Sequence, residues 1–296
     1  MAFQRPFSIN KDNENYMMKS TLITLMLLVA VKSGAQEQNI DQHWYSVPNE
    51  DLITLETLEG NVVFALSERL APKHVQRFKA LTAQGFFNDQ FFYRVVDGFV
   101  AQGGSNGNHS EDTRNSGTLD AEFVVKPSKD VVVIEHNDMF APATGFLVGF
   151  PVGLDTERNE MWGLHCPGTV AFARDVAKDT ASTEFYAVIG QAPRHLDRNM
   201  SVIGKVVSGM PVLQSLLRGN MENAGVLDVM EEKNKIISAT IGADRPIFIQ
   251  KTSHPEYEKR INTGRNLDNP FFHDNIFGPR AIDVCYHQLK VTSTPW

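Results

Sequence analysis

Cysteine is scarce in this sequence, since Cys166 and Cys285 are the only two among 296 residues and they form no CxxC pair. A zinc site built from several cysteines is therefore excluded. In an exported protein the two thiols could form one disulfide. Their positions in the sequence do not decide whether they lie within bridging distance.

Basic residues are also in short supply. The chain has 28 Lys and Arg against 35 Asp and Glu, which gives a net charge of −7. A negative surface repels phosphate backbones and anionic lipid headgroups. Nucleic acid and membrane are therefore not expected partners.

The uncharged apolar run near the start of the chain is too short to span a bilayer. Thr21–Val31 has 11 residues, whereas a membrane-spanning helix takes about 20. Lys19 precedes the run, and Ser33-Gly34-Ala35 supplies the small residues that a signal peptidase requires. We therefore predict that residues 1–35 are a signal peptide with a polar N-terminal leader, cleaved after Ala35.

Export follows from this prediction, so we expect a periplasmic or secreted protein with no membrane contact after cleavage. Loss of residues 1–35 removes four basic and two acidic side chains, which leaves a net charge of −9. A buried helix is the alternative interpretation of the apolar run. The polar leader would also fit initiation at Met17 or Met18.

The remaining sequence is typical of a mainly β protein. Two helices are indicated, one from Pro72 to Gly85 with apolar residues at three-residue spacing and one at 211–218. The absence of a βαβ repeat predicts a closed antiparallel sheet, a barrel or a sandwich. Strands are expected within 51–67, 91–101, 168–174, 184–190, 200–207, 235–241 and, near the end, 282–291. Residues 105–118 are a polar loop, and 119–166 give no clear order of elements.

One hairpin carries polar residues that need a reason. The stretch FFYRVVDGFVAQGG, residues 91–104, has a turn at Asp97-Gly98 between two apolar strands. Alternate residues of a strand share a face, so Arg94 and Gln102 can point into one shallow surface. Taken alone, Arg94 would be interpreted as a surface arginine in an ion pair.

Two other patterns are similar to a catalytic pair and to a metal-binding loop, but neither meets the requirements of such a site. His165 and Cys166 could form a nucleophilic pair, but adjacent residues of a strand point to opposite faces. Asp112 opens a segment similar to a calcium loop, but Arg114 stands where such a loop needs Asp or Asn. No metal site is therefore expected.

Four segments together resemble the cyclophilin family of peptidyl-prolyl cis-trans isomerases. They are FFYRVVDGFVAQGG, GTVAFAR, TEFYAVIG and LDRNMSVIGKVVSGM, in the family's order and at roughly its spacing. The resemblance implies a closed eight-stranded antiparallel β-barrel capped by two α-helices. It covers residues 50–246 as an isomerase domain with an insertion at about 105–165, after a linker at 36–49. A C-terminal extension, residues 247–296, lies beyond it.

The resemblance also implies roles for individual residues. Arg94 occupies the position of the catalytic arginine that faces a proline-containing peptide, and Gln102 that of the glutamine which orients peptide and arginine. Five more match substrate-binding positions: Phe99 at the floor of the proline pocket, Val100 beside it, Ala173 in the peptide groove, and Tyr186 and Leu196 in the pocket.

Three further substrate-binding positions depart from the usual family pattern. Glu184 stands where glutamine is usual, His195 where many members have tryptophan, and Met200 where many have a pocket histidine. These changes lie at the rim or wall of the pocket, so they affect substrate preference and inhibitor binding more than chemistry.

The implied reaction is rotation about an Xaa-Pro bond, which needs no cofactor. The expected partners are proline-containing polypeptides of the exported compartment, whose folding the protein would assist as a monomer. A non-catalytic module that binds proline-rich or unfolded segments, as a chaperone or scaffold, is the competing class; Arg94 favours the enzyme. A weaker alternative is a structural barrel whose function lies in the insertion or the tail.

Overall fold

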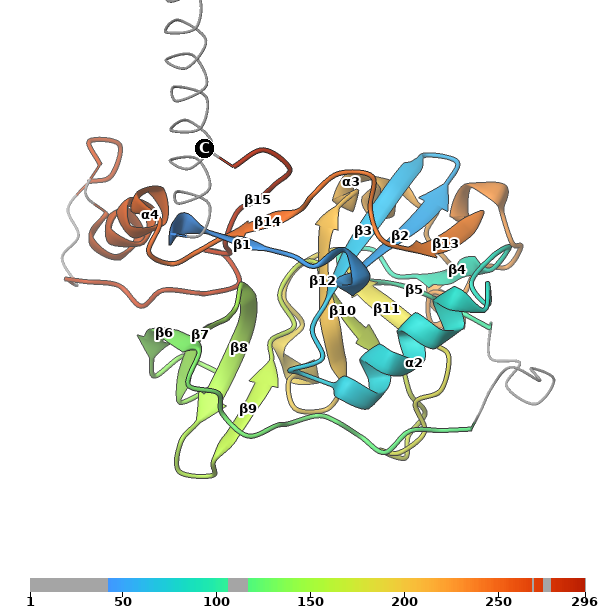
Figure 1. Ribbon diagram of the computed structural model, residues 1–296, viewed down its shortest axis with the longest axis horizontal. Helices are drawn as coiled ribbons and strands as arrows, with labels where there is room; N and C mark the ends of the chain where they lie inside the picture. The colour runs from blue at the N-terminus through green and yellow to red at the C-terminus, as the bar shows by residue number, and fades with distance from the viewer. Residues whose placement is uncertain (1–41, 106–116, 268, 274–277, 296) are drawn as a thin grey trace, which may run out of the picture.

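An eight-stranded antiparallel sheet dominates the computed structural model, which describes residues 42–105, 117–267, 269–273 and 278–295 (Figure 1). The predicted signal peptide lies outside the described residues. The strand order is β13-β2-β3-β12-β10-β11-β5-β4. Their bounds are β2 Leu52–Thr57, β3 Gly60–Leu66, β4 Phe91–Val95, β5 Val100–Gly104, β10 Thr169–Phe172, β11 Phe185–Val188, β12 Val202–Ser208 and β13 Ser238–Ile241. The predicted strand number and antiparallel pairing are confirmed.

The sheet is curled but open, so continuous closure of the barrel is not confirmed. The edge strands β4 and β13 are not hydrogen-bonded neighbours, and the edges meet only through a bridge between Phe91 and Lys235. The backbone of the loop before β13 forms hydrogen bonds with the free edge of β4 instead. Leu227 N donates to Tyr93 O at 2.8 Å, and Val95 N donates to Gly225 O at 2.9 Å. Because that edge is already satisfied, β13 does not need to pair with it.

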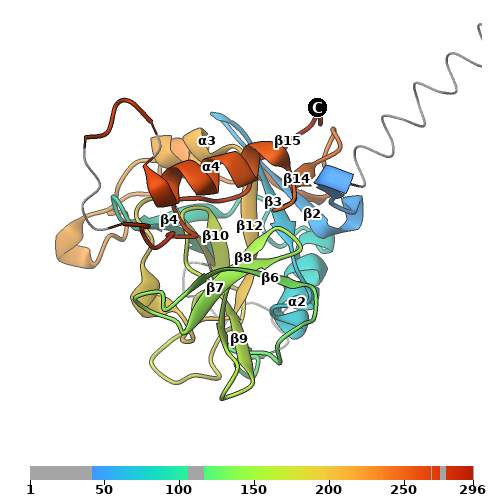
Figure 2. The same ribbon diagram turned by 90° about the vertical axis from the view of Figure 1, so that its left-hand side faces the viewer.

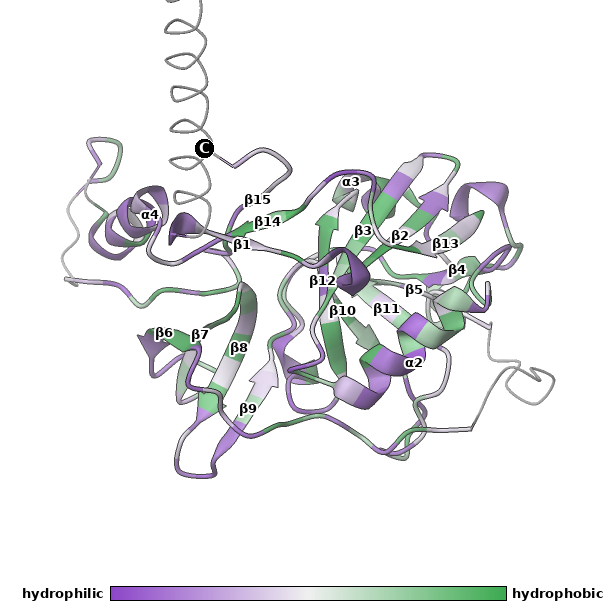
Figure 3. Ribbon diagram, in the orientation of Figure 1, coloured by the Kyte–Doolittle hydropathy of each residue, from purple (hydrophilic) through white to green (hydrophobic). Residues whose placement is uncertain are grey.

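The central strands of this sheet are buried on both faces. In β3, Val62 and Phe64 belong to the cluster inside the curl, whereas Val63 and Ala65 belong to a second cluster outside it. Strands β10 and β11 alternate in the same way. The runs 62–66 of β3 and 170–172 of β10 are therefore continuously apolar (Figure 3), because something covers each face.

Helix α2, Pro72–Ala83, fills the inner cluster with Val75, Phe78 and Leu81. These are the residues whose three-residue spacing predicted the helix. The second predicted helix is α3, Met210–Ser215, and it is shorter than the sequence indicated because Leu216 adopts an extended conformation. Leu213 packs it into the same cluster.

The cover of the outer face comes from the insertion. Strands β6 Val131–His136, β7 Ala143–Leu147, β8 Phe150–Asp155 and β9 Glu160–Gly163 form a second antiparallel sheet in that order. Leu147, Val152 and Met161 of this sheet pack in the outer cluster. The sequence analysis gave no order for this region, and it proves to be a meander of four strands.

A third sheet and a helix lie beside the insertion (Figure 2). The sheet joins β1 Trp44–Ser46, β14 Phe248–Gln250 and β15 Val291–Thr292, and the helix is α4, Pro255–Asn266. One apolar cluster combines Phe146 and Trp162 of the insertion with Ile249, Tyr257 and Leu289 of the tail. The strand expected within 282–291 is largely wrong, because turns occupy 284–287 and only Val291 begins β15.

Cys166 and Cys285 form a disulfide, which answers the question that the sequence left open. It joins the segment before β10 to the tail across 119 residues of chain. Short 3-10 turns complete the fold: η1 Asn49–Asp51, η2 Arg194–Leu196, η3 Met221–Asn223 and η4 Glu232–Asn234. Within the described ranges, no helix combines the length and apolarity needed to cross a membrane.

Candidate active site

Arg94 and Gln102 lie opposite each other on β4 and β5, as the hairpin pattern indicated. Arg94 Nη1 donates to Gln102 Oε1 at 3.1 Å, and Arg94 Nε donates to the carbonyl of Ala224 at 2.8 Å. Two hydrogen bonds on different sides therefore fix the plane of the guanidinium. Among the described residues, Nη2 has no protein hydrogen-bond partner, so it can donate to a bound molecule.

Tyr93 orients Gln102, a role that the sequence analysis did not assign. Gln102 Nε2 donates to the Tyr93 hydroxyl at 2.6 Å, which leaves Oε1 facing Arg94. The β4–β5 register shifts between Phe91 and Arg94, so β4 carries a bulge there. A bulge redirects a side chain, and strict alternation of faces therefore could not reveal this contact.

Burial raises the pKa of Tyr93, and the negative charge of nearby Glu184 raises it further. The hydroxyl therefore stays protonated in the physiological range and can accept from Gln102 without carrying charge. Ser105 Oγ donates to Glu184 Oε1 at 2.8 Å. Glu184, which stands where the family usually has glutamine, thus lies under the hairpin rather than at an exposed rim.

The glycine pair that ends the hairpin is needed for close approach. A Cβ at Gly104 would lie 2.6 Å from Oε2 of Glu184, and one at Gly103 would lie 3.1 Å from the carbonyl oxygen of Phe91. Gly104 also has φ +142°, which side chains rarely adopt. These glycines therefore let Glu184 and the bulged strand pack against β5.

The structure brings the predicted apolar site residues together beside Arg94. They pack in the outer cluster, Val100 and Tyr186 as buried members and the rest as half-buried neighbours: Phe99, Ala173, Leu196 and Met200. Val100 is only 2% exposed, so it supports the pocket and presents almost no surface to a substrate. The N–H of Ala173 donates to Glu184 O at 2.9 Å, so it is not available to a peptide.

His195 lies beside Phe99, at the surface of this group of apolar residues. Its exposed ring stacks on Phe99 with centroids 6.2 Å apart and an interplanar angle of 22°. The resemblance assigned His195 to the rim or wall of a proline pocket and Phe99 to its floor; that assignment stays a prediction. Turn η2 carries both His195 and Leu196, so one short element supplies rim and wall.

A polar group also lies behind the pocket. The Tyr186 hydroxyl pairs with His165 Nε2 at 2.8 Å, and His165 Nδ1 pairs with Asp197 at 3.1 Å. Burial, with the charge of Asp197 as the second cause, raises the pKa of Tyr186 well above its ordinary value. The adjacent Cys166 is in the disulfide, so the His165-Cys166 pair holds no free thiol.

Comparison with known proteins gives the family. The model of the cyclophilin-type peptidyl-prolyl cis-trans isomerases matches residues 52–241, more than half of the chain. This chain therefore belongs to the cyclophilin-type peptidyl-prolyl cis-trans isomerase family.

Bacterial relatives carry the same description. A probable peptidyl-prolyl cis-trans isomerase of Brucella suis is 29% identical over 195 residues, 66% of this chain and 84% of the relative. Peptidyl-prolyl cis-trans isomerase A of Dickeya dadantii is 28% identical over 193 residues, 63% of this chain and 82% of the relative.

A solved structure shares the fold over a longer stretch. Cyclophilin AquaCyp293 from Hirschia baltica superposes with a TM-score of 0.67 at 24% identity, over 86% of this chain and 95% of its own. That coverage exceeds what the family model spans, so the shared fold is not confined to residues 52–241.

Proposed function

We propose that this chain is a bacterial, exported peptidyl-prolyl cis-trans isomerase that acts on Xaa-Pro bonds of exported proteins and assists their folding. The observation that carries the proposal is Arg94, which Gln102 and Ala224 hold in place beside the apolar site residues. Its Nη2 has no hydrogen-bond partner among the residues that the structure describes. Membership of the family and the names of the relatives support the reaction. The proposed export depends on residues 1–35 alone.

The chemistry follows from the amide. Rotation about an Xaa-Pro bond crosses a barrier of about 20 kcal/mol because the lone pair of the nitrogen is delocalised into the carbonyl. In the twisted state that lone pair is localised on the prolyl nitrogen and accepts a hydrogen bond well. A guanidinium N–H directed at this nitrogen therefore stabilises the transition state more than the ground state.

The apolar site residues and Arg94 have different roles, since the former bind the proline ring and the latter donates the hydrogen bond. Phe99, Leu196 and Met200 offer half-buried apolar surface that can hold the proline ring while the preceding carbonyl turns. Arg94 suits the donor role because a guanidinium remains protonated at any physiological pH. Each group comes from one chain, so we propose that the monomer is sufficient; light scattering during size-exclusion chromatography checks this.

Arg94→Ala tests the mechanism in a protease-coupled isomerisation assay on a short Xaa-Pro peptide. Loss of a charge-assisted hydrogen bond of about 1.5–3 kcal/mol lowers kcat/KM by roughly one to two decades. Arg94→Lys should restore little, because an ammonium cannot bond Gln102, Ala224 and substrate from one plane. Arg218→Ala is the matched control, since it removes an arginine that pairs with Asp97 at the turn of the same hairpin.

The results separate the two classes of function. Near-normal catalysis by Arg94→Ala would contradict the mechanism. Wild-type protein that binds proline peptides without turning them over would favour the non-catalytic chaperone or scaffold. Export has its own test, because N-terminal sequencing of the mature protein should begin at Gln36, and a cytoplasmic chain that retains residues 21–31 would disprove it.

A further inference from the structure

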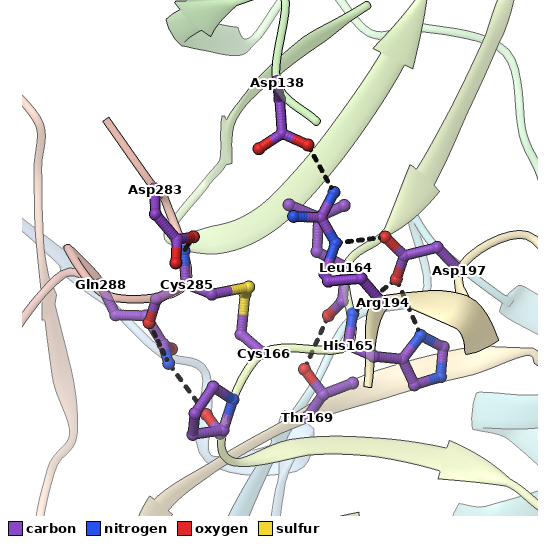
Figure 4. Close-up of a disulfide and its surroundings, with 11 residues drawn as sticks. Asp138, Leu164, His165, Cys166, Thr169, Arg194, Asp197, Asp283, Cys285 and Gln288 are labelled. Atoms are coloured by element: carbon purple, nitrogen blue, oxygen red, sulfur yellow. Dashed lines mark hydrogen bonds and ion pairs between the residues drawn. A yellow bond between two sulfur atoms is a disulfide. The ribbon is translucent and has the colours of Figure 1, made fainter. Parts of the chain in front are cut away.

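A chain of buried polar side chains runs from Asp138 of the insertion through Arg194 and Asp197 to His165 (Figure 4). It begins at Asp138, in the connection between β6 and β7. Asp138 Oδ1 accepts from Arg194 Nη2 at 3.0 Å, and Arg194 Nε donates to Asp197 Oδ2. The Arg194 and Asp138 side chains are only 5% and 9% exposed. The ring of Phe140, 5.1 Å from the guanidinium carbon, covers Arg194.

The chain continues from Asp197 to Tyr186. Asp197 Oδ1 accepts from the backbone N–H of His165 at 2.9 Å and also pairs with its Nδ1. A carboxylate can only accept, so Nδ1 carries a hydrogen. The remaining nitrogen, Nε2, pairs with the Tyr186 hydroxyl at 2.8 Å, and the two rings lie within 18° of parallel.

This arrangement ties the position of a pocket ring to a hydrogen bond. A phenylalanine at position 186 would be held by packing alone, whereas the buried hydroxyl of Tyr186 is costly unless it is paired. Its partner His165 is fully buried and is held in turn by Asp197. Asp197 keeps its orientation because Arg194 bridges it to Asp138.

We propose that Asp138, Arg194, Asp197 and His165 are positioning residues that hold Tyr186 in the proline pocket, so that the insertion is part of the substrate-binding apparatus. None of the four touches the reacting amide. Tyr186 is itself only 4% exposed, so their effect reaches substrate through the half-buried residues of the same cluster, Phe99, Leu196 and Met200. It therefore changes peptide affinity more than the rate of rotation in the bound state. The proposal rests on the proposed isomerase activity.

The experiment compares Asp138→Asn in two backgrounds, wild type and Tyr186→Phe, and measures kcat and KM on one Xaa-Pro peptide. In wild type, Asp138→Asn weakens one buried hydrogen bond of the chain, so KM should rise about 2- to 10-fold. We expect kcat to change by less than about 2-fold, because Arg94 is untouched. In the Tyr186→Phe background the hydroxyl is absent, and the same substitution should change KM by less than about 2-fold.

Asp130→Asn is the matched control. Asp130 also belongs to the insertion and pairs with an arginine outside it, Arg69, at 2.7 Å, but both side chains are nearly half exposed. This substitution removes a similar ion pair without touching the buried chain, so KM should stay within about 2-fold of wild type. Removal of one partner from a buried pair can unfold a protein. Arg194→Lys keeps the charge but replaces the two separate nitrogens that reach Asp197 and Asp138 by one. It therefore serves as a second probe with the same expected rise in KM.

Each outcome decides the proposal. An equal rise in KM in both backgrounds, or a loss of kcat with unchanged KM, would overturn it. So would an effect of Asp130→Asn as large as that of Asp138→Asn. If wild type shows no turnover, the proposed function fails. The positioning role is then measured by peptide binding instead, where Asp138→Asn should lower affinity only when Tyr186 is present.

Discussion

Removal of the Cys166–Cys285 disulfide should destabilise the whole molecule. The bond joins the barrel, just before β10, to the tail after α4. Both sulfurs lie in the apolar cluster shared by insertion and tail, and Cys166 is fully buried. The perturbation is the double substitution Cys166→Ala and Cys285→Ala, which introduces no charged or polar group into that cluster.

The size of the effect follows from the length of the closed loop. The two cysteines are 119 residues apart. Cross-linking a loop of this length lowers the entropy of the unfolded chain by an amount worth about 5 kcal/mol in the chain-entropy model. Relaxation in the folded state reduces the measured value, so we expect a loss of about 3–5 kcal/mol in the free energy of unfolding. For a protein of this size the melting temperature should fall by roughly 6–20 °C.

Urea unfolding monitored by tryptophan fluorescence measures this loss, because Trp162 lies in the same cluster. Wild type treated with dithiothreitol should move toward the double variant, and the double variant itself should not respond to reductant. Mass spectrometry after alkylation confirms how many thiols are free. If oxidised wild type and the double variant unfold within about 0.5 kcal/mol of each other, the loop-closure argument is wrong for this protein.

Three further predictions concern single side chains. Tyr93→Phe removes the acceptor that orients Gln102, so kcat/KM should fall about 2- to 10-fold. Tyr286→Phe, at an exposed ring, is the control and should leave kcat/KM unchanged. Equal kinetics for both variants would show that Tyr93 does not orient Gln102. Burial lowers the pKa of Lys205 from 10.5 to about 8. Near pH 7 the buried charge therefore lowers the free energy of unfolding by up to about 3 kcal/mol. Lys205→Met should therefore be stabilising at pH 7, by an amount that falls as the pH rises from 8 to 10.5; urea titrations across that range check the slope, and a constant difference would contradict it. Cyclosporin is a cyclic peptide inhibitor that many cyclophilins bind, and the resemblance implies that a tryptophan at position 195 would pack against it and donate an indole hydrogen bond. His195→Trp should therefore strengthen its binding by about 30- to 1,000-fold. Tight inhibition of wild type would refute the assignment of His195.

The hairpin of the site could be predicted because its determinants are local. A turn dipeptide fixes the register of β4 and β5, and the register places Arg94 opposite Gln102. The bulge beside Arg94 could not be predicted, since no residue pattern distinguished it from a regular strand. Tyr93 was missed for that reason, although it directly precedes Arg94 in the sequence.

The contacts behind the pocket depend on residues that are distant in sequence. His165 reaches Tyr186 across 21 positions, and Arg194 reaches Asp138 across 56. Each of these residues, taken alone, has an ordinary role in a strand, a turn or a surface ion pair. These residues come together only in the folded protein, because the insertion packs over the eight-stranded sheet beside turn η2.

The sequence of the central strands nevertheless indicates that both faces of the eight-stranded sheet are covered. Segments such as VAF in β10 and FYAV in β11 are apolar at every position, whereas a strand with one face in water alternates. Val188 and Ala171 point away from the inner core and still require burial. The segment between β5 and β10 buries them, a role that the sequence analysis did not assign to it. The insertion therefore buries a face that the strands of the eight-stranded sheet cannot leave in water, and its contact with Tyr186 follows from covering that face.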